Sequence, residues 1–376
     1  MMSYDEAVAY LIDTARHPRR AVERTLKDTG KEAIGCFPVY TPEEIIYAAG
    51  FVPVGVWGGR TELQLADKYL PRFCCSIMRS NIEYGMNGTY NALKGMVIPA
   101  FCDTLKCMIE NWKTAVPQVP AIPVVYAQNR LLEPGIEYME NEFGRVRDVL
   151  GELRGKPISD AALEEAFSVY EDYRSEMRTF TKLACDRTNS ISASVRHLII
   201  KAAYFMDKVA YTNVIREINA GLSAKEPEKS KGIRVIVTGY QAEPIELLDI
   251  FDESDIAIAG DDLAQESRQF RTPARPEGTA LERMAYRVAD QRGDTFFYEK
   301  AKTKGEMLVE MAKELRADGV VVCMMKFCDP EEFDYPVIKT TIEDAGFPLL
   351  YFETEQQMET FEQTRTRIQG FAEMLL

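Results

Sequence analysis

Short apolar runs recur along the chain, and stretches with helical spacing separate them. Continuous apolar runs of this length are typical of strands buried on both faces in a parallel sheet. The runs that predict strands cover residues 33–37, 51–57, 96–101 and 121–127 in the first half, and 233–239, 255–260, 319–327 and 348–354 in the second. Alternation of such strands with helices predicts an α/β fold.

The middle of the chain has a different pattern. From Ser159 to about Ile218, apolar residues recur at intervals of three and four, which predicts helices, and the polar stretch 221–232 is typical of a linker. A chain of 376 residues exceeds the usual size of a single core. We therefore expect two doubly wound parallel-sheet domains joined by a helical segment. The predicted divisions are residues 1–156 for the N-terminal α/β domain with its helical start, 157–230 for the helical connection and linker, and 231–376 for the C-terminal α/β domain.

A local helix signal follows the first predicted strand. Thr41 is placed as the N-cap, Pro42 as the first helical residue and Glu44 as the partner in a capping box, while Gly50 ends the helix. Glu43 and Glu44 could also point toward a site at the strand end, but the pattern favours a role in starting the helix.

The tripeptide Phe-Cys-Asp occurs twice, each time where a predicted strand ends and a helix begins, with its cysteine at Cys102 or Cys328. Ligands of open α/β sheets gather at the carboxyl ends of strands, and a helix N-terminus favours a thiolate. Each following aspartate is expected to cap its helix. Cys75 also precedes a predicted helix, with Cys74 as its immediate rival. The two halves are thus expected to close on one inorganic site.

The remaining cysteines are weaker candidates. Cys323 lies inside an apolar strand and Cys185 has no obvious partner, so both are interpreted as structural. The spacing of the three candidates differs from the close pairs of zinc fingers and from the clustered cysteines of ferredoxins. An iron–sulfur cluster held by only three thiolates would leave one iron open to a substrate oxygen or water.

Composition excludes several other classes. The net charge of −14 opposes binding to nucleic acid or to an anionic membrane surface, and no apolar stretch approaches the roughly 20 residues that cross a bilayer. The N-terminus lacks a secretory signal, so a cytoplasmic protein with its eight cysteines reduced or metal-bound is expected. Two histidines offer little material for histidine-rich metal sites. No phosphate loop or dinucleotide fingerprint is present, so any ATP would be hydrolysed by another protein.

Five segments of the chain carry a likeness to a known family. They are KEAIGCFPVYTPEEIIYAAGFVPVGVWGG at 31–59, CSIMRSNIEYG at 75–85, IPAFCDTLKCMIENWK at 98–113, DDLAQESRQFRTP at 261–273 and CMMKFCDPEEFDYPVIKTTIEDAGFPLLYFETE at 323–355. These segments resemble the 2-hydroxyacyl-CoA dehydratases, a family that includes the 2-hydroxyglutaryl-CoA dehydratase D-component and belongs with the benzoyl-CoA reductases. The likeness is greatest to the smaller, β-type subunits. The resemblance implies that Cys75, Cys102 and Cys328 bind the cluster, with Cys107 a weaker competitor for the middle place.

The resemblance implies an oxygen-sensitive lyase of anaerobic amino-acid fermentation. It would be a heterodimer with an α subunit and would carry one 4Fe-4S cluster in this chain. It also implies that an ATP-dependent iron–sulfur activator protein supplies one electron to the thioester carbonyl of the (R)-2-hydroxyacyl-CoA. The ketyl radical anion would expel its hydroxyl, the resulting enoxy radical would lose a β-proton, and return of the electron would give the 2-enoyl-CoA. The resemblance further implies that the acyl-CoA would bind mainly at the partner subunit and that this chain would relay the electron. Arg268 and Arg271 are interpreted as part of an interface.

Two alternatives remain from the sequence. One is a low-potential reductase of the benzoyl-CoA reductase or double-cubane type, and the other is a cluster-bearing electron-relay subunit without activity of its own. The acyl chain of the substrate and the fourth ligand of the cluster stay open.

Overall fold

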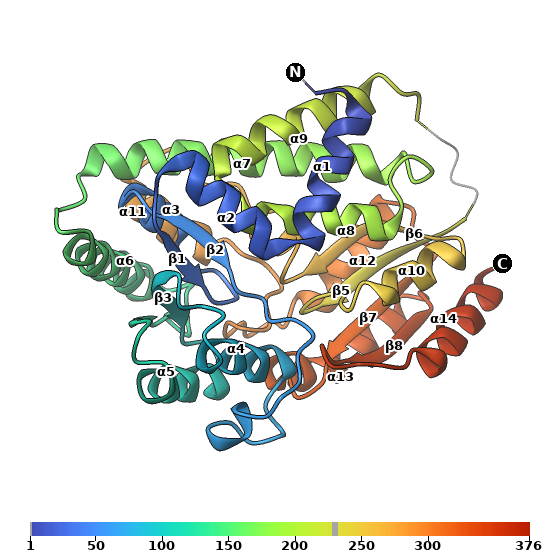
Figure 1. The fold of residues 1–376 in the computed structure, drawn as a ribbon. Helices are drawn as coiled ribbons and strands as arrows, with labels where there is room; N and C mark the ends of the chain where they lie inside the picture. The colour runs from blue at the N-terminus through green and yellow to red at the C-terminus, as the bar shows by residue number, and fades with distance from the viewer. Residues whose placement is uncertain (1, 228–231) are drawn as a thin grey trace.

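A computed structural model describes residues 2–227 and 232–376, and within them the strands form two parallel sheets of four strands each (Figure 1). The first sheet has the order β2-β1-β3-β4 and the second the order β6-β5-β7-β8. The predicted strands and the α/β class are confirmed. The strands are β1 Ala33–Cys36, β2 Val52–Gly55, β3 Leu93–Pro99, β4 Ala121–Val124, β5 Ile233–Gly239, β6 Ile256–Leu263, β7 Gly319–Met325 and β8 Leu349–Thr354.

Helices cover both sheets, and the long helices of the middle segment lie along one side of the two of them (Figure 1). No helix in the described part of the chain is both long and apolar enough to cross a bilayer. The helices are α1 Tyr4–Arg16, α2 Pro18–Thr29, α3 Glu43–Ala48, α4 Ser76–Met86, α5 Asp103–Ala115, α6 Glu133–Arg154, α7 Asp160–Cys185, α8 Ala193–Ala202, α9 Lys208–Ser223, α10 Glu246–Glu253, α11 Ala280–Ala289, α12 Lys304–Glu314, α13 Asp329–Asp344 and α14 Glu362–Leu375.

The helical middle of the chain is confirmed, but the linker begins later than predicted. Helix α9 continues to Ser223, so the first residues of the predicted linker 221–232 are helical. Its residues 228–231 lie outside the described part of the chain. The apolar spacing of α9 continues to Leu222, which is buried, and this packing extends the helix into the polar stretch.

The two sheets have the same strand order. In each, the first strand in the sequence has the second strand on one side and the third on the other, and this position is the switch point of the sheet. In the first sheet β1 lies between β2 and β3, and in the second β5 lies between β6 and β7. All of these pairs are parallel. Ligands of such sheets bind beyond the carboxyl ends of the two strands that flank the switch point. The candidate site should therefore lie beyond β1 and β3 in one half and beyond β5 and β7 in the other.

Packing crosses the predicted domain boundaries at two places. The core around the first sheet includes Met284 and Val288 of α11 together with Phe296 and Phe297, which follow it in the chain. At the other end, α1 packs on α8 and α9 of the middle segment. Residues of the second half are thus part of the core around the first sheet. The domain boundaries at residues 156 and 230 stay a prediction.

The predicted capping box of α3 is wrong. No side chain caps this helix, which begins at Glu43, and the Thr41 hydroxyl donates instead to the carbonyl oxygen of Phe37 at 2.7 Å. Glu44 is buried and pairs with Arg174 of α7. A buried arginine needs an anionic partner, and this tertiary ion pair takes the carboxylate that the local cap would have used. Gly50, at φ +82°, follows the helix as predicted.

Candidate metal centre

Three cysteines from separate parts of the chain occupy the same position relative to a helix. Cys75 is the N-cap residue of α4, Cys102 of α5 and Cys328 of α13. Cys102 follows β3 and Cys328 follows β7, the outer strands of the two switch points. The unpaired N–H groups and the dipole of each helix start favour negative charge on the sulfur.

The prediction that the aspartates cap these helices is wrong. Asp103 and Asp329 are the first residues inside their helices, and the cysteines hold the cap positions. The Asp103 side chain is 91% exposed and lies 3.4 Å from the amine of Lys106. These aspartates therefore add negative charge to the first turn of each helix but do not cap it.

The three thiols lie close enough to act on one another. Burial, together with the neighbouring Cys102, raises the pKa of Cys75 to about 12. The pKa of Cys328 lies well above its usual range because of burial, with Glu331 and Cys75 adding to the effect. The backbone N–H of Met78 opposes the shift at Cys75, as an N–H at a helix start should. Mutually close, buried thiols stay protonated near neutral pH unless a cationic centre compensates their charge.

This arrangement does not suit a single metal ion. Within residues 2–227 and 232–376, no group of three or more histidine, cysteine, aspartate or glutamate side chains is placed to hold one ion. A polynuclear cluster needs no such convergence, because each thiolate binds a different iron. Three thiols at three helix starts, with Cys75 and Cys328 buried and Cys102 half-buried, fit that kind of group.

Tyr240 provides a separate sign of an occupant between the thiols. It directly follows β5, the central strand of the second switch point, and its buried hydroxyl has no hydrogen-bond partner among the described residues. Burial raises its pKa well above the usual range, and Cys75, Cys328 and Cys102 raise it further. An orphaned hydroxyl is costly in a protein interior, so this group fits a site in which it would donate to a bound ligand. The sequence analysis missed it, although its place after a strand at the switch point was a usable signal.

Aromatic packing holds Tyr240 in place and shields the thiols. Its ring centroid lies 5.9 Å from that of Trp57, in the first half, and 5.7 Å from that of Phe296. Phe296 in turn lies 5.9 Å from Phe101, the neighbour of Cys102. These rings exclude water from the space around the thiols.

Hydrogen bonds join the two halves beside Cys75. The Ser76 hydroxyl donates to the sulfur of Met325 at 3.2 Å and accepts from the backbone N–H of Gln356 at 3.0 Å. The Gln356 side chain donates to the carbonyl oxygen of Trp57 at 2.5 Å and accepts from the N–H of Gly59 at 2.8 Å. Helix α4, which begins beside Cys75, is thereby fixed against the carboxyl ends of β7 and β8.

The interpretation of Arg268 as part of a solvent-facing interface is wrong. Its side chain is fully buried, 3.0 Å from Asp262 and 2.8 Å from Glu331, while Lys304 lies 2.9 Å from the other oxygen of Glu331. Arg271 pairs with Asp262 from the edge of this group and is 18% exposed. The carboxylates of Asp262 on β6 and Glu331 on α13 make the burial of the Arg268 and Lys304 cations possible. Since Glu331 lies in the first turn of α13, the network fixes the helix that starts at Cys328.

The other cysteines lie in different surroundings. Cys74 is buried and accepts a weak hydrogen bond from the Thr104 hydroxyl at 3.9 Å, and Cys107 is exposed on α5. Cys185 accepts from Arg234 at 3.0 Å, and Cys323 lies inside β7 with burial raising its pKa. None of these four caps a helix. Cys75, Cys102 and Cys328 alone share that position among the cysteines, all of which the structure describes.

The family model for 2-hydroxyglutaryl-CoA dehydratase, D-component, matches residues 38–375. The chain is 43% identical over 363 residues to the (R)-phenyllactyl-CoA dehydratase beta subunit of Clostridium sporogenes, covering 96% of this chain and 97% of that protein. It is 41% identical to the lactoyl-CoA dehydratase subunit beta of Anaerotignum propionicum, with full coverage of both. It is also 38% identical to the (R)-2-hydroxyglutaryl-CoA dehydratase subunit beta of Acidaminococcus fermentans, covering 93% and 94%. Similarity to a benzoyl-CoA reductase subunit is lower, at 25%.

Proposed function

The chain belongs to the 2-hydroxyacyl-CoA dehydratase family, as a D-component, and from this we propose that it is the β subunit of an iron–sulfur (R)-2-hydroxyacyl-CoA dehydratase. Its relatives are subunits of hydro-lyases, and the reductase alternative has the weaker similarity. The observation that carries the proposal is the common placement of three cysteines. Each is the N-cap residue of a helix: Cys102 and Cys328 follow β3 and β7 at the two switch points, and Cys75 lies at a loop-to-helix junction.

We assign Cys75, Cys102 and Cys328 as the ligands of one 4Fe-4S cluster. Bound there, the cluster would supply one-electron transfer and an iron with a position that no cysteine fills. The chain's part is to hold negative charge in a water-poor space. The N–H groups of three helix starts stabilise the thiolates, and the Tyr240 hydroxyl offers a donor toward the same space. Trp57 and Phe296 pack on Tyr240 and keep water out.

We also propose that the chain works with two other proteins. The beta-subunit names of its relatives support an α subunit as a partner. The sequence has no phosphate loop, which supports a separate ATP-dependent activator as the electron donor. The acyl-CoA would bind mainly at the partner subunit, where the elimination of water gives the 2-enoyl-CoA, and this chain would relay the electron.

Cysteine substitution tests the cluster assignment. The chain is purified and reconstituted without oxygen, and its iron content and electron paramagnetic resonance spectrum are measured after reduction. Each of the substitutions Cys75→Ser, Cys102→Ser and Cys328→Ser should remove most of the iron or change the spectrum, since a weaker oxygen ligand replaces a thiolate. Cys107→Ser is the matched control, because this exposed residue follows Cys102 on α5 without capping it, and should retain wild-type iron. A wild-type chain without a reducible iron–sulfur signal would refute the assignment.

Reconstitution with the partner tests the reaction. The chain, its α subunit and the activator are combined without oxygen and supplied with a panel of (R)-2-hydroxyacyl-CoA esters. Dehydration should proceed with catalytic amounts of electrons and should need all three proteins. Consumption of electrons in proportion to product would support the reductase alternative instead.

A further inference from the structure

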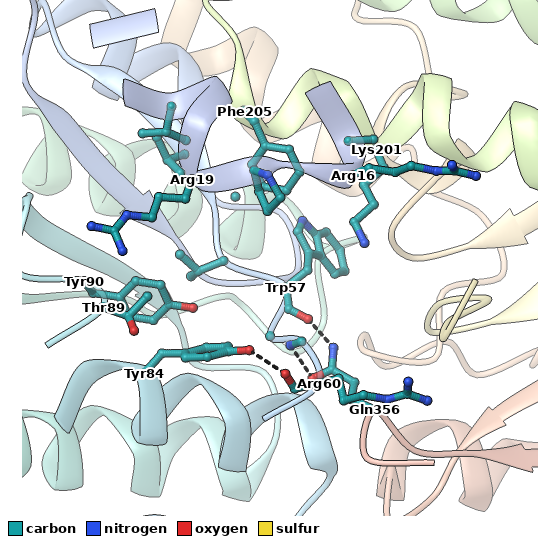
Figure 2. A pocket seen from close by; sticks show the side chains of 18 of the residues that line it. Arg16, Arg19, Trp57, Arg60, Tyr84, Thr89, Tyr90, Lys201, Phe205 and Gln356 are labelled. Carbon is teal, nitrogen blue, oxygen red and sulfur yellow. Dashed lines mark hydrogen bonds between the residues drawn. The ribbon is translucent and has the colours of Figure 1, made fainter. Parts of the chain in front are cut away.

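Trp57, whose ring packs on Tyr240 of the candidate metal centre, also lines a pocket, which Figure 2 shows from close by. Its volume is about 830 Å³, within the range of small-molecule and cofactor sites. Four aromatic side chains are part of its wall. Trp57 follows β2 and Phe205 follows α8, while Tyr84 lies in the last turn of α4 and Tyr90 beyond that helix. Figure 2 shows Tyr84 and Tyr90 together on one side of Trp57.

The aromatic wall is rigid. The Tyr84 and Tyr90 rings lie 5.7 Å apart edge to face, and the Tyr90 hydroxyl donates to Asn81 at 2.7 Å. The Tyr84 hydroxyl donates to the carbonyl oxygen of Arg60 at 3.2 Å. Held in this way, the rings offer a preformed surface on which a flat heteroaromatic ring can pack.

Cations and carboxylates both line the pocket, and three of the four cations pair with a carboxylate of the lining: Arg19 with Glu23, Arg60 with Glu246 and Lys201 with Glu243. Arg16 and Lys201 lie on one side of Trp57 and Arg19 on the other, with Arg60 below (Figure 2). Arg60 pairs with Glu246 at 3.2 Å in an ion pair whose side chains are 50% and 40% exposed. Exposed pairs of this kind contribute little, so a phosphate can displace the carboxylate.

Arg16 is the cation most available to a ligand. It is exposed in the last turn of α1, and within the described residues no ion pair involves its guanidinium. Lys201 on the same side already donates to Glu243. An arginine that faces a pocket without an anionic partner suits a phosphate, which it can bind through two parallel hydrogen bonds.

We propose that this pocket binds the phosphorylated adenosine end of a coenzyme A ester, with the adenine against the tyrosines and the phosphates against Arg16 and Arg60. The inference rests on the proposed function for the choice of coenzyme A among phosphorylated nucleotides. Trp57 lines the pocket on one side and packs on Tyr240 on the other. This subunit would therefore hold the adenosine end of the ester, with the Trp57 side chain between that end and the Tyr240 side of the candidate metal centre. The chain would then contribute to ester binding as well as to electron relay.

Isothermal titration calorimetry on the full chain tests this site without need of activity. Coenzyme A and adenosine 3′,5′-bisphosphate should both bind, while pantetheine should not. The double change Arg16→Ala, Arg60→Ala should weaken coenzyme A binding by roughly 10-fold or more, because it removes charge-assisted hydrogen bonds to phosphate. Arg72→Ala is the matched control, since this arginine is 85% exposed, pairs with Asp67 and lies outside the pocket lining.

Several outcomes would overturn the assignment. They are the absence of coenzyme A binding, equal binding by the double variant and the wild type, binding of pantetheine alone, and binding of ADP as tightly as coenzyme A. If the double variant does not fold by circular dichroism, Arg16→Ala alone serves, because it breaks no ion pair of the described chain, and it should bind roughly 5-fold more weakly. Binding of coenzyme A by a chain that never takes up iron would refute the proposed cluster and keep this site. An iron-loaded chain without such binding would refute only this site.

Discussion

Replacing Glu331 by glutamine tests whether the buried charge network positions the metal centre. The carboxylate of Glu331 lies 2.8 Å from Arg268 and 2.9 Å from Lys304, and all three side chains are at most 3% exposed. Glutamine keeps the shape but removes the charge, so two buried cations lose a direct partner. Loss of one partner from a buried ion pair costs about 3–5 kcal/mol, and we expect the lower end because the amide oxygen still accepts a hydrogen bond.

The assay is urea unfolding of the full chain followed by circular dichroism. With a slope of about 3 kcal/mol/M, a loss of ~3 kcal/mol lowers the midpoint by about 1 M. Iron uptake should fall as well, because Glu331 lies in the first turn of the helix that Cys328 caps. The control is Glu253→Gln, which removes an exposed pair with Arg365 and should change stability by less than about 0.5 kcal/mol.

The same residue predicts a dependence on pH. Burial acts to raise the pKa of Glu331, but Arg268 and Lys304 outweigh it, and the pKa is lowered overall. A lowered folded pKa adds stability that is present above the unfolded value of about 4.3 and is lost as the pH falls through the folded value. The wild-type advantage over Glu331→Gln should therefore shrink in acid. A cost below about 1 kcal/mol at pH 7, or one no larger than that of the control, would refute the argument.

Three further predictions follow from single groups. Tyr240→Phe keeps the ring packing but removes the unpartnered hydroxyl. In the reconstituted chain, the midpoint potential of the iron–sulfur cluster should become more negative by roughly 50 mV, because a hydrogen-bond donor toward the cluster is lost. A redox titration that gives the wild-type potential would contradict this role of the hydroxyl. Burial acts to lower the pKa of His197, but bonds to two glutamates raise this pKa overall. The stability that His197 adds is therefore fully present below its unfolded pKa of about 6.5 and is lost as the pH rises through its folded pKa. Thermal melts of His197→Gln should differ most from those of the wild type at low pH. Gly239→Ala should lower the free energy of unfolding in urea by about 3 kcal/mol, because φ at Gly239 is +139° and a Cβ there would lie 2.1 Å from the carbonyl oxygen of Cys323. The control is Gly370→Ala in helix α14, where an added Cβ would meet no atom within 4 Å and should stabilise the chain slightly.

Where local chemistry decides, the sequence was a good guide. The apolar runs marked all the strands of the two sheets, because buried parallel strands must be apolar on both faces. Gly50 ended its helix as predicted, since few other residues adopt a positive φ at low cost. The helix starts after Cys75, Cys102 and Cys328 were also recognised from the local pattern.

Predictions that needed a distant partner failed. The capping box of Thr41 and Glu44 was wrong because Arg174, far along the chain, takes the carboxylate. Arg268 was placed on an interface because charged stretches are usually solvated, and only its pairing with Asp262 and Glu331 makes it a buried residue. Local patterns carry no information on which opposite charges will meet in the interior.

The sequence by itself determined the strands, the helices and the cysteines that begin three of them, because these follow from apolar periodicity and from chain geometry between neighbours. The tertiary structure decided which strand ends face one another. The order of strands in both sheets places Cys102, Cys328 and Tyr240 beyond two switch points that close on the same space, with Cys75 added from a loop-to-helix junction. Sheet order and buried charge pairing depend on contacts between residues far apart in the chain, and those contacts exist only after the chain has folded.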